Sequence, residues 1–203
     1  MALLSTLVER IADVEGMDKA QASGIARYLR EAGYISQAGR GRGAAHMTAR
    51  DAAHLLIGLN ASKTAKDSPE ELRYYRSLTN RWNYVSNLDG ICKWGNNLVD
   101  DFEQIILLCQ DAGFSKDLLR PKAYDIDYAI EISASFHWPI RYVMIFIKEI
   151  IYQDYVPEDS DLAKGLYGDL PMEGKRNTQE PDRKEVITIT HQTFLAVAEL
   201  LKS

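Results

Sequence analysis

The chain is short of cysteine and has no long apolar run. Its 203 residues include two cysteines, Cys92 and Cys109, which are too few for a disulfide framework. No stretch approaches the roughly 18 consecutive apolar residues of a membrane helix. The opening residues MALLSTLVERIADVEG lack the basic start and cleavage site of a signal peptide. We therefore expect a reduced, cytoplasmic protein with no membrane contact, and a buried thiol at Cys109.

The sequence also lacks the motifs of the common enzyme classes. It has no phosphate-binding loop, no GxSxG nucleophile elbow, and no GxGxxG between a strand and a helix. Acids are paired at Asp100 and Asp101 and at Asp125 and Asp127, but no partnering base accompanies them. The histidines are too scattered for a metal site, and His54 is expected on a helix surface or at an interface. We predict no catalysis, no cofactor and no metal.

Basic residues are fewer than acidic ones, 24 against 29, and they are unevenly distributed along the chain. The net charge is −5, yet residues 1–66 hold nine Lys and Arg against six Asp and Glu. The N-terminal third is therefore mildly basic and the remainder acidic. This asymmetry predicts that any contact with a polyanion is made by the N-terminal part.

The sequence predicts a small helical module over residues 1–62. Apolar residues recur at helical spacing from Leu3 to Val14, and Gly16 is expected to end that helix. A second helix is predicted from Asp18, as its N-cap, to about Ala32. Residues 34–36 and 46–48 could form a hairpin around the loop GRGRG. A third helix is expected after Thr48, capped together with Asp51.

For the rest of the chain, the sequence predicts a linker over residues 63–69 and an α+β body over residues 70–203. Helices are predicted over 68–85, with Ser68 as N-cap, and over 96–114. Residues 126–136 alternate apolar and polar, which indicates a half-buried strand. Residues 140–156 fit a partner strand, although a helix over the first half is equally compatible. Residues 157–184 read as a long flexible loop, 185–190 as a strand, and the C-terminus as a helix. We predict a mainly α fold with a small antiparallel sheet.

The second helix carries a row of polar and basic side chains beside its apolar face. On a helical wheel, Ala22, Ile25, Ala26 and Leu29 share one side, and an adjacent stripe holds Lys19, Ser23, Arg27 and Arg30. A helix held by its apolar side and offering long donors is suited to a DNA major groove. Arg40 and Arg42, set between glycines in the following loop, are suited to phosphates or a narrow minor groove.

The stretch IADVEGMDKAQASGIARYLREAGYIS resembles the helix-turn-helix and wing start of winged-helix regulators of the MarR type. Residues 26–59 are also similar to DNA-binding proteins carried by prophages of α-proteobacteria. The resemblance covers about the first 60 residues. It implies a winged helix-turn-helix, groove contacts by Lys19, Ser23, Arg27 and Arg30, and backbone or minor-groove contacts by Arg40 and Arg42. The loop departs from MarR-type wings in carrying no acidic residue.

Three functions remain open from the sequence. The first is a sequence-specific DNA-binding regulator, a repressor of phage or phage-derived genes that binds double-stranded DNA as a homodimer. The second is a phage DNA-packaging protein resembling a small terminase subunit, which would form a larger ring. The third is a protein-interaction module that binds no nucleic acid.

Overall fold

The structure is a computed structural model that describes residues 2–37, 45–80, 84–85, 95, 97–114, 132–138, 141–147, 151–156 and 185–202. Its helices are α1 (Leu4–Glu15), α2 (Lys19–Glu31), α3 (Ala49–Ala61), α4 (Ser68–Arg76), α5 (Leu98–Gln110) and α8 (His191–Lys202). Its strands are β1 (Thr79–Asn80), β2 (Tyr84–Val85), β3 (Ile132–Trp138), β4 (Tyr142–Ile147), β5 (Ile151–Val156) and β6 (Glu185–Thr190). The predicted α+β fold, mainly helical with an antiparallel sheet, is confirmed.

The first three helices begin where the sequence predicts, and the first two also end there. Gly16 takes φ 67° after α1 and Gly33 takes φ 82° after α2, a backbone conformation that favours glycine. The Asp18 side chain accepts from the N–H of Gln21 at 2.7 Å and so caps α2. Thr48 and Asp51 form a reciprocal capping box at the start of α3.

The helix predicted over 68–85 is shorter than expected. It ends at Arg76, and Thr79–Asn80 pairs with β5 instead. Its N-cap is Asp67 rather than Ser68, whose hydroxyl is buried and donates to the Ala65 carbonyl at 2.7 Å. Strand pairing with a distant segment therefore overrides the local helical spacing of the residues after Arg76.

The sheet is antiparallel, in the order β1-β5-β4-β3-β6, with β2 also paired to β5. Residues 142–147 and 151–156 are both strands, which decides the ambiguity over 140–156. Along β3 the even residues are buried and the odd ones half-buried, as the alternation predicts, and the strand continues through Trp138. The part of that prediction over 126–131, and the loop 157–184, lie outside the described residues.

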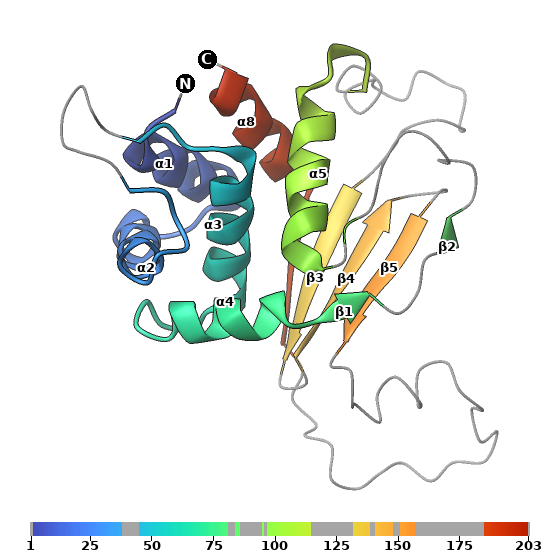
Figure 1. The fold of residues 1–203 in the computed structure, drawn as a ribbon, viewed down its shortest axis with the longest axis horizontal. Helices are drawn as coiled ribbons and strands as arrows, with labels where there is room; N and C mark the ends of the chain where they lie inside the picture. Colours follow the sequence, from blue (N-terminus) through green and yellow to red (C-terminus); the bar gives the residue numbers. More distant parts are fainter. Residues whose placement is uncertain are drawn as a thin grey trace, which may run out of the picture.

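The helices gather on one side of the sheet (Figure 1), with α5 beside β3 and α3 between α5 and the pair α1 and α2. One apolar cluster extends from Leu7 in α1 to Ala198 in α8. Phe102 of α5 lies at its centre, with ring centroids 6.1 Å from Phe136 of β3 and 5.3 Å from Phe194 of α8. The residues predicted as two domains therefore share a core. No helix among the described residues is long and apolar enough to cross a membrane.

The core contains a cysteine, and a partly buried carboxyl group lies at its edge. Cys109 is buried, as predicted, and burial raises the pKa of its thiol to about 12. Near the end of α1, burial raises the pKa of Glu15 from 4.5 to about 7, against the opposing hydrogen bonds from Asn60 and Thr193. The amide of Asn60 donates to the two Glu15 carboxylate oxygens at 3.1 and 3.4 Å. Glu15 is thus a carboxyl group whose ionised form is poorly solvated.

The raised pKa of Glu15 makes the stability of the fold depend on pH. The folded chain holds this proton more tightly than the unfolded chain, so Glu15 disfavours folding increasingly as the pH rises from 4.5 to about 7. We expect Glu15→Gln to raise the free energy of unfolding by about 1–2 kcal/mol at pH 8 and to change it little at pH 4.5. Urea unfolding at both pH values measures this, with Glu9→Gln on the exposed side of α1 as the control. An equal effect at both pH values contradicts it.

Candidate nucleic-acid interface

The apolar side of α2 fixes the helix against its neighbours. Ala22, Ile25, Ala26 and Leu29 are all buried at 2% exposure or less. Two glycines allow close packing there: a Cβ on Gly58 of α3 would come within 2.5 Å of Leu29, and a Cβ on Gly24 within 3.3 Å of Ala65. The rotation of α2 about its own axis is therefore set by its packing, and with it the direction of its polar side.

The four predicted contact residues of α2 are all exposed, namely Lys19, Ser23, Arg27 and Arg30. At helical spacing they fall within an arc of about 80°. A turn of three residues, Gly16 to Asp18, joins α2 to α1. The structure thus brings these four side chains together on one outward surface.

Acidic side chains contact two members of this row. Lys19 Nζ lies 2.7 Å from an Asp13 oxygen, and this pairing raises the pKa of Lys19. Arg27 Nε lies 3.7 Å from Glu31 and its guanidinium stacks over the Tyr28 ring at 5.1 Å. Each charged group in these two pairs is more than half exposed. Exposed pairs of this kind contribute about 0–1 kcal/mol, so a phosphate can replace the acid.

The loop with Arg40 and Arg42 lies within 38–44, outside the described residues. Its flanks are described on both sides. The Gln37 side chain donates to the Arg30 carbonyl at 2.5 Å, so the chain enters the loop beside the last turn of α2. The N–H of Met47 donates to the Ala2 carbonyl at 2.9 Å. Residues 34–37 and 45–48 form no strand, so the hairpin expected there is absent from these described flanks.

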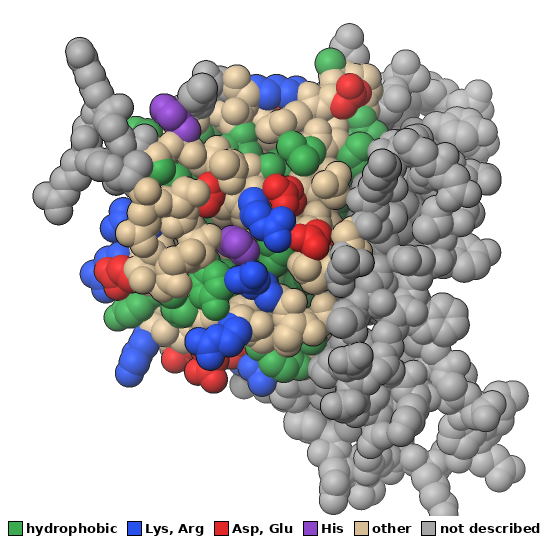
Figure 2. All heavy atoms as spheres, in the orientation of Figure 1, with side chains coloured by type: hydrophobic (Ala, Val, Ile, Leu, Met, Phe, Trp, Pro, Cys, Tyr) green, Lys and Arg blue, Asp and Glu red, His purple; other side chains and the backbone are tan. Residues whose placement is uncertain are grey.

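A basic side chain that the sequence did not indicate lies close to the end of α2. The guanidinium of Arg76, in the last turn of α4, stacks over the Tyr34 ring at 5.4 Å. Figure 2 shows Lys and Arg side chains along the α2 and α4 sides of the face drawn, with acids between them. The sequence predicts residues 63–69 as a linker between domains, and therefore gives no reason to place Arg76 beside Tyr34.

The expectation that His54 lies on a helix surface or at an interface is wrong within this chain. Its side chain is 7% exposed, and Nδ1 lies 2.7 Å from the Tyr34 carbonyl, which places the proton on Nδ1 in the neutral ring. Burial, and then the charges of Arg76 and Arg50, lower its pKa. His54 therefore ties the segment after α2 to α3.

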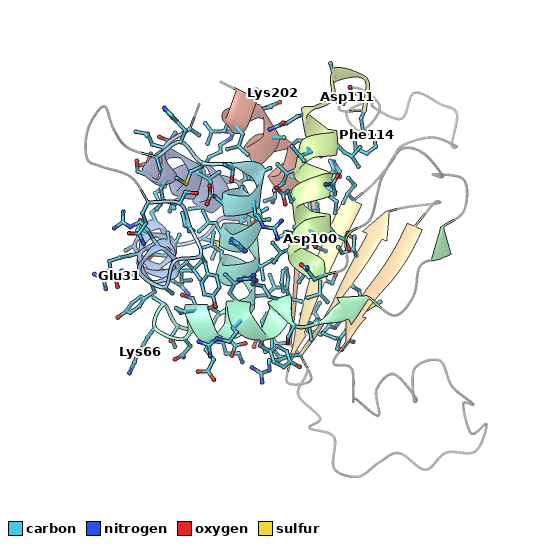
Figure 3. All side chains as sticks on the ribbon, viewed as in Figure 1. Glu31, Lys66, Asp100, Asp111, Phe114 and Lys202 are labelled. Carbon is cyan, nitrogen blue, oxygen red and sulfur yellow. The ribbon has the colours of Figure 1, made fainter. Side chains whose placement is uncertain are left out.

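The paired acids of α5 have structural contacts. Asp100 lies 2.8 Å and Glu103 2.6 Å from the guanidinium of Arg50 on α3, and Figure 3 shows Asp100 facing that helix. Asp101 is fully buried and accepts from the N–H of Gly95 at 2.5 Å. Asp125 and Asp127 lie outside the described residues. Among the side chains that the structure describes, no group of three His, Cys, Asp or Glu could hold a metal ion.

Comparison with family models, with curated proteins and with solved structures gave no match.

Proposed function

We propose that this protein is a sequence-specific DNA-binding transcriptional regulator, a repressor of phage or phage-derived genes that acts as a homodimer in the cytoplasm. The observation that carries the proposal is the exposed row Lys19, Ser23, Arg27 and Arg30 on a helix whose opposite side is buried. Such a helix, held rigidly and joined to α1 by a short turn, can enter a major groove.

The basic loop supplies the second part of the proposed surface. The Gln37 side chain donates to the Arg30 carbonyl at the end of α2, and the sequence that carries Arg40 and Arg42 follows directly after this residue. Helix contacts would read base edges, and loop contacts would neutralise phosphates or enter the minor groove. A two-fold pair of chains would place two such surfaces on a palindromic site.

Removing the loop arginines is expected to weaken DNA binding and its dependence on salt. Each cation that neutralises a phosphate adds about 0.9 to the slope of log affinity against log salt, so Arg40→Ala with Arg42→Ala should reduce that slope by about 2. Fluorescence anisotropy with a duplex selected from bound genomic DNA, titrated over several salt concentrations, measures both quantities. Unchanged affinity and slope would exclude the loop from the interface.

Removing the acid beside Arg27 is expected to strengthen DNA binding. Glu31 competes with phosphate for the guanidinium and repels the duplex. We expect Glu31→Gln to tighten binding by about threefold at low salt, and less as salt rises. Glu199→Gln is the matched control, because Glu199 is equally exposed and pairs with Arg10 on the α1–α8 side. The same gain in both variants would indicate net charge alone.

The exposed edge of the sheet favours a second candidate, a protein-interaction module. Val186 and Ile187 of the edge strand β6 are 50% and 38% exposed. Strands of this kind pair readily with an extended segment of another protein. Co-purification of a protein partner, together with no shift of any duplex, would favour this candidate over the regulator. The mass in solution separates a dimer from the larger ring of a packaging protein.

A further inference from the structure

A hollow of about 390 Å³ lies between the ends of α1 and α3, the edge strand β6 and the start of α8. It is distant in the sequence from the loop arginines and belongs to none of the contacts described above for DNA. Its volume is in the range of small-molecule sites, which start at about 300 Å³. Three segments far apart in the chain, 14–17, 59–60 and 187–193, therefore line an open hollow large enough for a small ligand.

The lining of the hollow combines an apolar body with one ionisable group. Glu15 contributes the carboxyl group, and hydrocarbon comes from Val14, Met17, Leu59, Ile187 and Ile189. The neutral polar side chains of the lining are Asn60, Thr188, Thr190, Gln192 and Thr193. Asn60, which donates to Glu15, and Thr193, which also lowers its pKa, are both neutral. Lys63 and Glu185 do not line the hollow and pair with each other at 3.2 Å. Within the part of the chain that the structure describes, Glu15 is thus hydrogen-bonded by a neutral group and has no counter-ion.

The two polar side chains that accompany Glu15, Asn60 and Thr193, each carry an oxygen that can accept a hydrogen bond. The Asn60 amide nitrogen already donates to Glu15 and, at 3.0 Å, to the Leu56 carbonyl, so Asn60 offers a ligand its Oδ1. Thr193 also lines the hollow, and its hydroxyl oxygen can accept a hydrogen bond. A carboxylate with acceptor oxygens beside it matches a group with several donors and a positive charge. An ammonium group, with three donors and no acceptor, has this chemistry.

We propose that this hollow binds a protonated primary amine with a short apolar body, and that the Glu15 carboxylate is its counter-ion. The ammonium group of the ligand pairs with the Glu15 carboxylate, and the hydrocarbon part of the ligand packs on Leu59 and Ile187. The ligand would contact α1 and α3 on one side and β6 and α8 on the other.

Calorimetric titration of the full chain with n-butylammonium chloride at pH 8 tests the proposal. We expect saturable binding with a dissociation constant of about millimolar or tighter, and at least a tenfold weakening in Glu15→Gln. Glu9→Gln, the exposed acid on the same helix, should bind as the wild type does. Butanol and butyrate should bind at least tenfold more weakly than the ammonium. Equal binding of butanol, or no weakening in Glu15→Gln with its fold retained by circular dichroism, would overturn the proposal.

A second titration distinguishes the source of the amine. Nα-acetyl-lysine methylamide presents the same ammonium group on a piece of backbone, as a lysine of a partner protein would. Tighter binding of this compound than of n-butylammonium supports the site with a protein lysine as its ligand, and the reverse order supports it with a free amine. No binding of either compound overturns it. None of these measurements involves DNA, so their failure and the failure of the proposed function are independent.

Discussion

Replacing Arg27 and Arg30 together with alanine is expected to lower the affinity for the target duplex by about 100-fold. Both side chains project from the exposed side of α2, where each contact to a base edge or phosphate contributes about 1–3 kcal/mol. The decrease should be larger on the target sequence than on unrelated DNA, because base contacts carry the discrimination. Fluorescence anisotropy with target and scrambled duplexes at one salt concentration measures this difference.

A control that removes the same charge separates direct contact from net charge. Arg10→Ala with Lys202→Ala also removes two exposed positive charges, from the α1–α8 side of the molecule. Figure 3 shows Lys202 at the end of α8, away from Glu31 on α2. This control should reduce binding by no more than about threefold through long-range electrostatics. If the two double variants reduce affinity equally, α2 is not the recognition surface.

Replacing Phe102 with alanine is expected to cost about 3–5 kcal/mol of unfolding free energy. Its ring is fully buried and contacts Phe136 of the sheet and Phe194 of the last helix. Truncation removes these contacts and leaves a cavity that the rigid surroundings fill only in part. For a domain of ordinary stability, about 5–15 kcal/mol, this is a large share of the total. Urea unfolding followed by far-ultraviolet circular dichroism measures the change.

Leu107 provides the matched control on the same helix. It is 43% exposed, so Leu107→Ala should change the unfolding free energy by no more than about 0.5 kcal/mol. The comparison also tests whether the helices and the sheet share one core. If Phe102→Ala costs less than about 1 kcal/mol, or if it melts the C-terminal elements alone, the continuous cluster from Leu7 to Ala198 is refuted.

The sequence predicts well wherever a local signal decides the structure. The glycines at 16 and 33, the Asp18 cap and the Thr48–Asp51 capping box are short-range features, and the helices they bound lie close to where they are expected. The alternation along β3 is equally local and correctly assigns its buried face. The exposure of Lys19, Ser23, Arg27 and Arg30 follows from helical periodicity for the same reason.

The errors occur where distant segments compete with a local pattern. Thr79 and Asn80 fit a continuing helix, yet they pair with Tyr155 and Val156, which no short window contains. The burial of His54 could not be predicted from its neighbours in the sequence. Its ring contacts the Tyr34 carbonyl, which lies 20 residues away along the chain. The position of Arg76 over the Tyr34 ring is unpredicted for a similar reason, because the two residues are far apart in the sequence.

The sequence by itself determined the starts of the first three helices, the identity of the exposed row on α2 and the inward side of β3, because backbone conformation and periodicity are properties of adjacent residues. Only the tertiary structure decided that both halves share one core, that Asp13 and Lys19 form a pair, and that Glu15 lines a hollow with residues from α3, β6 and α8. Those features depend on burial and on long-range packing, which raise the pKa of a carboxyl group or enclose a hollow only after the chain has folded.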